Sequence, residues 1–480
     1  MSIAIRVLYG LLRLGLWLLA GMLIVGALYV SIGRQFMPLM AEYREEIEQQ
    51  LQLRLQQTVK VEQLTGRWRG FSPLLEARYV TLGEGDDAVQ VDSLYIQPDV
   101  VSSLLAREVR FKNVTLTGLQ IHLQQDQQGR WALQGLQLHD VEQAAFQLND
   151  WLVRLRQVAQ LSVLDSRVII QAHDNEPLVL RYTGFTLSRT EQQQRLDLRA
   201  VLPDGEVLEL SAQGQLISED WRQSTLAVYL KTPSSNLARW VPKALLQDSQ
   251  VTTLSVAGAL WLRAAQGQMH SAVLRLDDFE LEGRAAHAEP LHLRSQQALA
   301  FYQNSAQLQS AWFESFKLQI NDLPTRDWRM SLAYEHEKTP LWQLSLEQLE
   351  LTDVHYVLER VWQLPEVGAD VLNTMQPSGT LNNVQLQWRP EAELAQRLTF
   401  DSNLNNVEFS AWRDVPASSG ISGRISGDLL QGELRLASET GFSLHLANLF
   451  AEPWQYQRAH ARLLWQFDEQ GFTLESPYLQ

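Results

Sequence analysis

The sequence predicts a mainly β protein with an N-terminal transmembrane helix and an elongated, repetitive, antiparallel-rich β-sheet, curled into a groove or trough with a few short covering helices. Three observations predict it. Residues 14–33 carry no charge, apolar and polar residues alternate along most of the chain after residue 58, and a unit of one helix followed by strands recurs loosely. The 480 residues are enough for one elongated domain or for two to three compact ones.

The composition excludes several functional classes. Lys and Arg number 40 against 55 Asp and Glu, so the formal net charge is −15 and a nucleic-acid partner is not expected. The sequence contains no cysteine, which removes disulfides, thiolate nucleophiles and cysteine–zinc sites together. The same absence leaves the redox compartment undecided.

The uncharged segment at 14–33, LGLWLLAGMLIVGALYVSIG, is long enough to cross a membrane. At about 1.5 Å per residue, a helix of this length spans roughly 30 Å, the thickness of the hydrocarbon core of a bilayer. A secretory signal peptide is the alternative, because Ser31-Ile32-Gly33 resembles a cleavage site. The apolar run exceeds the ~7–15 residues usual for a signal peptide, which favours a retained transmembrane helix.

Basic residues on the two sides of this segment predict its orientation. Arg6, Arg13 and the amino terminus precede it, and Arg34 and Arg44 follow it. The slight excess on the N-terminal side places residues 1–13 in the cytoplasm. The rest of the chain would then lie across the membrane, in the periplasm if the cell is a Gram-negative bacterium.

Residues 34–57 predict an amphipathic helix. Apolar residues recur at every fourth position and form one stripe, while several glutamates occupy the remaining surface. The stripe is short and lacks a sustained heptad, so we expect the helix to pack on the start of the sheet rather than in a coiled coil. The stripe consists of Leu39, Tyr43, Ile47, Leu51 and Leu55.

The segment GRWRGF at 66–71 is the corner where the β region begins, and it lies near the membrane if residues 14–33 are an anchor. It lacks the lysine and the glycine spacing of a phosphate loop. We expect its glycines to turn the chain, and Trp68 and Phe71 to plug the start of the apolar face. Arg67 and Arg69 either contact anionic lipid headgroups or are plain solvated charges.

Strand-like alternation dominates the segments 58–140 and 161–480. About 25 runs of this kind are separated by turn signals such as Pro203-Asp204-Gly205. Each run has an apolar and a polar side, and the apolar side is the candidate lining of a groove. The candidate lining residues are Leu119, Ile121, Leu123, Leu196, Leu198, Leu208, Leu210, Leu254, Val256, Leu260, Met330, Leu332, Leu344, Leu346, Leu434 and Leu436.

Helical periodicity interrupts the strands in three places. Residues 141–160 and residues 236–247 each predict one helix. Residues 353–376 predict two, with Asp353 as a capping residue of the first and Pro365 between them. We expect these helices to cover edges or ends of the sheet, which otherwise invite aggregation.

The alternation by itself leaves two architectures open. The apolar sides meet in the dry core of sandwiches or small barrels, or they line an open trough. The scarcity of helices and the loose repeat, whose copies include strands at 258–262 and 379–388, favour an elongated sheet. An apolar trough of that length requires acyl chains or another protein to cover it, and beside a membrane helix lipid is the simplest ligand.

The sequence shows no constellation of catalytic residues. None of the ten histidines stands in a zinc-protease pattern, and SGISGRISG at 419–427 lacks a serine with glycine two residues before and two after it. The 15 tryptophans allow sugar stacking, but many lie in strand runs where packing or lipid contact explains them. We therefore predict a protein that is not an enzyme and needs no metal or other cofactor.

Three segments resemble a known family. VKVEQLTGRWRGFSPLLEARYVTL at 59–82, following the anchor and the striped helix, is similar to the opening of AsmA-like envelope proteins. VRFKNVTLTGLQIHLQQDQQGRWAL at 109–133 is similar to their next segment. LPEVGADVLNTMQPSGTLNNVQLQW at 364–388 resembles a segment of the long YhdP type, in which a short helix precedes Pro-x-Gly-x-Leu.

The resemblance implies a bridge-like lipid-transfer protein, related to the TamB group, with its single-pass anchor in the inner membrane and its bulk in the periplasm. Phospholipids would move between the inner and outer membranes with their acyl chains in a β-groove. The implied partners are the inner-membrane bilayer, phospholipids and other envelope proteins of either membrane. The family contributes no catalytic residues and no cofactor. A non-transporting scaffold that supports outer-membrane assembly or integrity remains the alternative function.

The chain departs from the family in length. Members of the YhdP type are usually far longer, so the resemblance implies that the groove at 161–480 is truncated at its C-terminus. With strands about 4.8 Å apart, some 25 strands make a trough of about 120 Å. We expect a trough of this length to need its missing part or a partner to cross the envelope.

Overall fold

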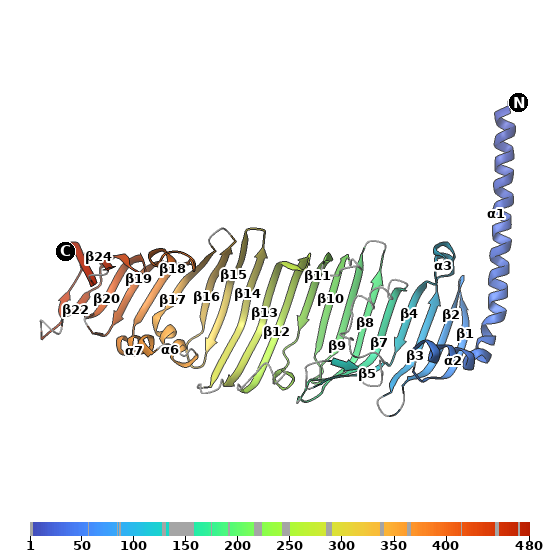
Figure 1. The fold of residues 1–480 in the computed structure, drawn as a ribbon, viewed down its shortest axis with the longest axis horizontal. Coiled ribbons are helices and arrows are strands. Elements are labelled where there is room, and N and C mark those ends of the chain that lie inside the picture. Colours follow the sequence, from blue (N-terminus) through green and yellow to red (C-terminus); the bar gives the residue numbers. More distant parts are fainter. Residues whose placement is uncertain are drawn as a thin grey trace. The chain divides into compact units, whose positions relative to one another are not determined.

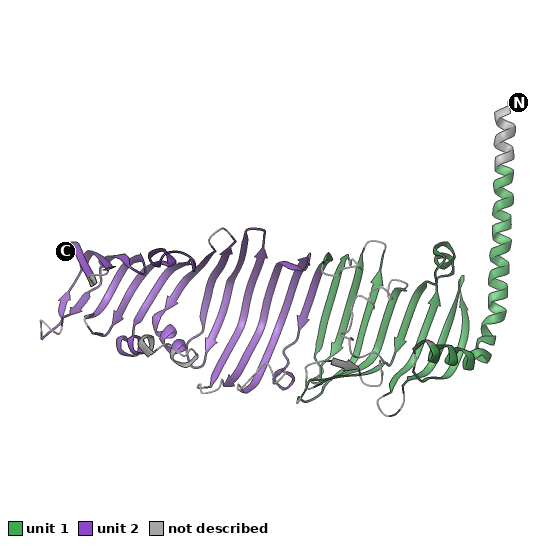
Figure 2. Cartoon of the chain, viewed as in Figure 1, with its two compact units in different colours: residues 1–226 green, residues 227–480 purple. Residues whose placement is uncertain are grey.

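The computed structural model confirms a mainly β protein with an N-terminal apolar helix, mostly antiparallel strands and few short helices (Figure 1). Two compact units divide the chain, residues 1–226 and residues 227–480 (Figure 2). The structure describes all residues except 1–2, 56, 84, 86–87, 127–130, 134–157, 174, 191–192, 216–222, 242–249, 285–289, 337–339, 362–365, 414, 447–450 and 469–470.

The N-terminal region is helical. Helix α1 (Ile3–Phe36) contains the uncharged segment, and it is long and apolar enough to cross a membrane, with none of its most apolar stretch buried. Residues 34–57 do not form one continuous α-helix, since the structure has a 3₁₀ helix η1 (Met37–Tyr43) between α1 and α2 (Arg44–Leu55). Pro38 lies in the first turn of η1, where a missing N–H costs no hydrogen bond.

The first unit contains strands that pair mostly as antiparallel neighbours in chain order. The exception is β7, which runs parallel to β4 and to β5. Both β4 and β5 lie between β3 and β7, so together they form one interrupted strand. The strands are β1 (Val59–Arg69), β2 (Ser72–Leu82), β3 (Val89–Pro98), β4 (Phe111–Thr117), β5 (Gln120–Gln125), β6 (Trp131–Leu133), β7 (Val158–Gln171), β8 (Leu178–Arg189), β9 (Gln194–Val201) and β10 (Val207–Gln215), with the short helix α3 (Val100–Ala106) after β3.

The helix expected at 141–160 is only partly open to comparison. Residues 141–157 lie outside the described part of the chain, and residues 158–160 begin β7 instead of ending a helix. Parallel strands cannot be joined by a tight turn, so the chain must make a crossover between β5 and β7.

The second unit is a succession of antiparallel strands from β12 to β20, followed by a more branched arrangement in which β20 pairs with both β21 and β22. Strand β21 then pairs with β24, and β24 with β25. The strands are β12 (Gln250–Ala265), β13 (Gln268–Arg284), β14 (Leu291–Asn304), β15 (Leu308–Ile320), β16 (Arg326–Glu335), β17 (Leu341–Glu350), β18 (Ser378–Trp388), β19 (Leu398–Phe409), β20 (Ala417–Asp428), β21 (Gln431–Ser438), β22 (Phe442–His445), β23 (Trp454–Tyr456), β24 (Ala459–Asp468) and β25 (Gly471–Leu479), while β11 (Thr225–Thr232) contains the boundary between the units.

The helices of the second unit differ in part from expectation. The predicted pair at 353–376 is confirmed as α6 (Leu351–Val361) and α7 (Glu366–Met375). Asp353 lies in the first turn of α6 and pairs with Arg326, so it is not the capping residue we expected. At 236–247 the structure has only the 3₁₀ helix η3 (Ala238–Trp240), because Pro242 disfavours helical backbone at the preceding residue; residues 242–249 lie outside the described part. A further short helix, α8 (Leu394–Arg397), precedes β19.

Strict alternation of side chains is interrupted in β2, in β7, in β8 and between β4 and β5. At each interruption one residue has a positive φ, and these residues are, in the same order, Tyr79, Asp165, Tyr182 and Gly118. Ala77 and Val80, three residues apart on β2, are therefore both buried in one cluster, which strict alternation forbids. Such interruptions act as β-bulges, which bend a strand and re-aim the side chains beyond them.

The end of helix α1 is fastened to the first strand by aromatic and glycine contacts. The ring of Trp68 lies edge-on to Tyr29, with ring centroids 5.2 Å apart, and its Nε1 donates to the carbonyl of Gly70 at 2.9 Å. A Cβ placed on Gly33 would lie 2.1 Å from the Trp68 ring, and one placed on Gly66 would lie 2.4 Å from the carbonyl oxygen of Met37. These glycines let helix and strand approach closely.

Three arginines lie side by side on β20, β21 and β24, where Arg435 is the direct neighbour of Arg424 and of Arg462. Like charges in such positions repel each other. Asp401 binds Arg424 at 2.8 Å, and Glu433 accepts hydrogen bonds from the other two at 2.6 and 2.8 Å. Those hydrogen bonds from Arg435 and Arg462 lower the pKa of Glu433 to about 2.

We expect Gly33→Val to loosen the contact between α1 and β1, because the new side chain overlaps the Trp68 ring; overpacking of this kind costs about 1–3 kcal/mol. Trypsin cleavage after Arg34 and Arg44, which flank η1, should become faster. Gly26→Val is the matched control, since a Cβ there meets nothing within 4 Å. Equal cleavage rates in the two variants would show that the glycine contact does not hold the helix.

We expect Glu433→Gln to destabilise the protein at neutral pH and to lose this effect in acid. The carboxyl titrates near 4.5 in the unfolded chain and near 2 in the folded one, so its stabilising contribution is full above about pH 4.5 and disappears as the pH falls to about 2. Denaturant midpoints of wild type and variant, followed by circular dichroism, should therefore converge over that interval. Glu408→Gln, at an exposed position of β19, is the control and should leave the midpoint unchanged.

Candidate functional site

In the first unit, backbone register places apolar residues of successive strands directly beside one another. One row crosses β1 to β10 without a charged residue, and a second runs beside it. The predicted residues Leu196, Leu198, Leu208 and Leu210 all lie on this apolar face. The first row is Leu64, Ala77, Leu94, Leu116, Val163, Phe185, Leu198 and Leu210, and the second is Gly66, Leu75, Ile96, Val114, Leu161, Leu187, Leu196 and Ala212.

The second unit has an apolar face of the same kind. Its nine predicted residues, from Leu254 to Leu436, lie on one face when the pairs are followed from strand to strand. The longest row is Leu262, Ala272, Tyr302, Ala311, Leu332, Leu344, Leu386, Phe400, Gly427, Gly432 and Trp465, and the adjacent row is Leu260, Leu274, Ala300, Phe313, Met330, Leu346 and Val384.

The apolar face of β12–β17 is not the dry core of a sandwich. Among the described residues of these strands, the buried hydrophobic side chains are two alanines, Ala259 and Ala298. The large apolar side chains of the rows are half-buried, and Leu332 is 41% exposed. A residue in a close-packed core is normally covered on all sides. Here the side chains touch their neighbours within the sheet, and no second layer from the described part of the chain covers them.

Packed clusters exist elsewhere on these faces. Leu119 belongs to a buried cluster of the first unit, against which Ile121 and also Ile47 of α2 pack. Leu436 belongs to a buried cluster of the second unit, against which Leu434 packs. These four predicted lining residues therefore stabilise the fold and contribute little open surface. The cluster of the first unit confirms that α2 packs on the start of the sheet.

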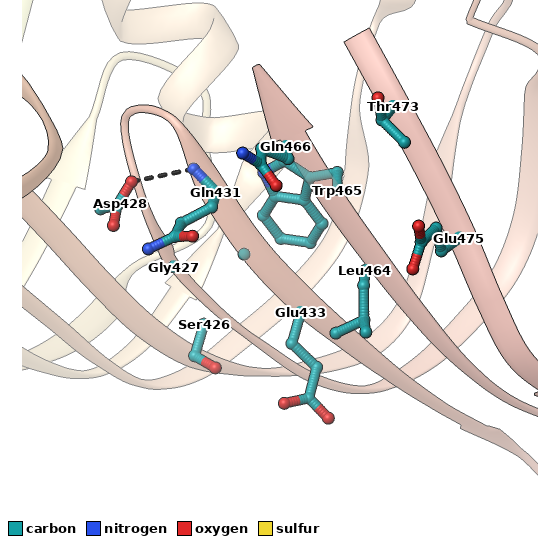
Figure 3. A pocket seen from close by; sticks show the side chains of 11 residues that line it. Ser426, Gly427, Asp428, Gln431, Glu433, Leu464, Trp465, Gln466, Thr473 and Glu475 are labelled. Atoms are coloured by element: carbon teal, nitrogen blue, oxygen red, sulfur yellow. Dashed lines mark hydrogen bonds between the residues drawn. The ribbon is translucent and has the colours of Figure 1, made fainter. Parts of the chain in front are cut away.

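Two glycines interrupt the long row of the second unit and make room for aromatic rings. Phe400 and Trp465 stand on β19 and β24, yet their rings are nearly parallel with centroids 6.5 Å apart, because Gly427 and Gly432 lie between them. A Cβ on Gly432 would lie 2.0 Å from the Trp465 ring. A hollow of about 410 Å³ next to these strands is bordered mainly by polar groups (Figure 3): Ser426, Asp428, Gln431, Glu433, Gln466, Thr473 and Glu475.

The residues of the predicted corner have different roles. Arg67 pairs with the buried carboxylate of Glu76 at 3.4 Å, and Arg78 pairs with it at 2.6 Å. Burial raises the pKa of Glu76, but the hydrogen bond from Arg78 and the charges of both arginines outweigh burial and hold that pKa below its ordinary value. Arg69 is exposed, and Phe71 is 76% exposed at the tip of the β1–β2 hairpin. Glu76 is not among the residues predicted from the sequence. The signal that could have identified it is a charged residue within a mostly apolar strand.

Clustered ionisable groups give no further site. Within the described residues, no group of three or more His, Cys, Asp and Glu side chains lies close enough to hold a metal ion. The paired carboxylates that have shifted pKa values, at Glu76, Asp197 and Glu433, are held by arginines in ion pairs. We therefore take the apolar face as the candidate binding site.

Comparison with known proteins agrees with the architecture. The family model of the YhdP protein matches residues 1–480. The chain is 23% identical over 483 residues to the intermembrane phospholipid transporter YhdP of Escherichia coli strain K12, a match that covers 96% of this chain and 36% of that protein. The chain thus spans about a third of the length of this relative. No solved structure matches. Because the family model covers the whole sequence, the chain belongs to the YhdP family.

Proposed function

We propose that this protein carries phospholipids between the inner and outer membranes, with their acyl chains against its apolar face. The single observation that carries the proposal is the pair of apolar rows across β12–β17, whose large side chains are half-buried or exposed. Helix α1 would anchor the chain in the inner membrane with its N-terminus in the cytoplasm and its bulk in the periplasm. The similarity to a phospholipid transporter supports the choice of ligand.

Burial alone supplies the attraction. Each CH₂ group moved from water to an apolar surface gains about 0.8 kcal/mol, so an acyl chain gains several kcal/mol even when one side of it stays open. Neighbouring strands offer nearly equivalent apolar sites, which lets a lipid move along the face without crossing a large barrier. Such a face requires no catalytic residue, metal or cofactor. Direction of movement would come from a lipid gradient or from partner proteins at either membrane.

The scaffold alternative makes a different structural demand. A protein that only supports outer-membrane assembly through its surface gains nothing from an open apolar face, and its strands would close into packed sandwiches or barrels. Clusters of that kind account for parts of both units. The half-buried apolar side chains of β12–β17 weigh against the scaffold alternative. Apolar area that faces solvent lowers solubility unless a ligand covers that area.

We expect the double variant Leu332→Asp/Leu344→Asp to lose bound phospholipid. The two residues face each other on β16 and β17, and a charge in a hydrocarbon environment costs about 2.5–3.5 kcal/mol. Phospholipid recovered with the protein from cells, quantified by mass spectrometry, should fall at least tenfold.

The neighbouring pair Ser331→Asp/Ser345→Asp is the matched control, because these residues also face each other but point to the opposite side of the sheet. It should retain wild-type amounts of lipid, and circular dichroism should show intact strands in both variants. A wild-type protein without lipid, or equal lipid in both double variants, would contradict the proposed function.

A further inference from the structure

One edge of the apolar face in the second unit is lined by amphipathic aromatic residues. Tyr334, Trp342 and Trp388 are neighbours in register on β16, β17 and β18. The rings of Tyr334 and Trp342 have centroids 4.5 Å apart, and Trp388 is 48% exposed. We call these three residues the aromatic edge. Gln309 of β15 continues the same row as the partner of Tyr334.

Apolar rows follow at increasing distance from the aromatic edge. The first contains Leu332 and Leu344, the next contains Met330 and Leu346, and Trp328 lies one row further along β16. Since a strand rises about 3.4 Å per residue, Trp328 lies roughly 20 Å from the row of Tyr334. One leaflet of a bilayer holds about half of a hydrocarbon core of roughly 30 Å. The face is therefore deep enough for an extended acyl chain lying along the strands.

The opposite edge is closed by helix α6, which follows β17 directly at the end of the strands (Figure 1). Asp353 of α6 is 5% exposed and binds Arg326, at the start of β16, at 2.9 Å. The hydroxyl of Tyr356 accepts a hydrogen bond from the side chain of Asn321, between β15 and β16, at 2.9 Å. These two contacts hold α6 against the ends of β15 and β16, so this edge has a fixed helical wall.

We propose, as an extension that rests on the proposed function, that phospholipids bind this part of the face in one orientation. Their headgroups lie at the aromatic edge, and their acyl chains run along the strands toward α6. Tyr and Trp prefer the boundary between hydrocarbon and water, because their rings are apolar and their O–H and N–H groups seek polar partners. The aromatic edge provides that boundary on one side of the face, and the helical wall leaves a headgroup less room on the other.

Single cysteines can test the orientation, because the natural sequence has none. Gln309→Cys reports on the row of the aromatic edge, and Leu318→Cys on the row that contains Arg326 near α6. Ser331→Cys, which points to the other side of the sheet, is the control. Each variant of the full chain carries a bimane label and is loaded with phosphatidylcholine bearing a nitroxide either on its headgroup or near the end of one acyl chain.

The headgroup nitroxide should quench the label at 309 at least threefold more than the label at 318, and the chain nitroxide should do the reverse. Equal quenching at both positions, or the reversed preference, would overturn the orientation while leaving lipid binding intact. If neither the label at 309 nor the label at 318 is quenched more than the control label at 331, the proposed function itself is overturned. The two failures are thus distinguishable.

A second variant tests the aromatic edge as a positioning element. Trp342→Leu/Trp388→Leu keeps apolar side chains in the row but removes both indole N–H groups. Bound phospholipid measured by mass spectrometry should stay within twofold of wild type. The ratio of quenching by the headgroup nitroxide at position 309 to that at position 318 should fall to near one. An unchanged preference would show that these rings do not orient the lipid, and loss of the strands in circular dichroism would be seen separately.

Discussion

The structure depends on one constraint: the apolar side of each strand must face the same way as that of its neighbours. Side chains in a strand alternate with a period of two, so a slip of one residue would turn every apolar side chain of that strand to the other face. The rows that cross β1–β10 and β12–β24 show that register is kept over many strands within each unit. Where the apolar pattern itself shifts, the backbone absorbs the shift at residues such as Asp165 and Tyr182, which adopt positive φ.

A face maintained in this way has different properties along the chain. Near the N-terminal helices it is covered by α2 and packs into a cluster that includes Val59 and Val163. In β12–β17 it stays half-exposed, and among the described helices η3 contacts β12 and α6 contacts β17. Near β20–β24 it closes again around Ile421 and Leu436. The buried side chains are thus concentrated in these two clusters, and the half-exposed stretch of β12–β17 is where we propose that the ligand binds.

Several charged groups of the described strands are held in ion pairs. Arginines in neighbouring strands would repel each other, and the carboxylates of Asp401 and Glu433 relieve the repulsion. Glu76 is the one buried carboxylate of the corner, and its ion pairs use the side chain of Arg67. Arg67, one of the two arginines considered for contact with lipid headgroups, thus makes an ion pair within the protein while its side chain stays largely exposed. Its neighbour Arg69 remains exposed.

The sequence by itself determined the β class, the long apolar helix, the pair of helices near residue 360 and the sides of the strands on which Leu198, Met330 and Leu344 lie. These follow from periodicity and charge, which act between residues close together in the chain. Only the tertiary structure decided that Leu119 and Leu436 are packed while Leu332 is open, and that Ala77 and Val80 share one face. Alternation is a local property of an extended backbone and identifies the apolar side of a strand. Whether that side is covered depends on contacts between residues far apart in sequence, which no local pattern records.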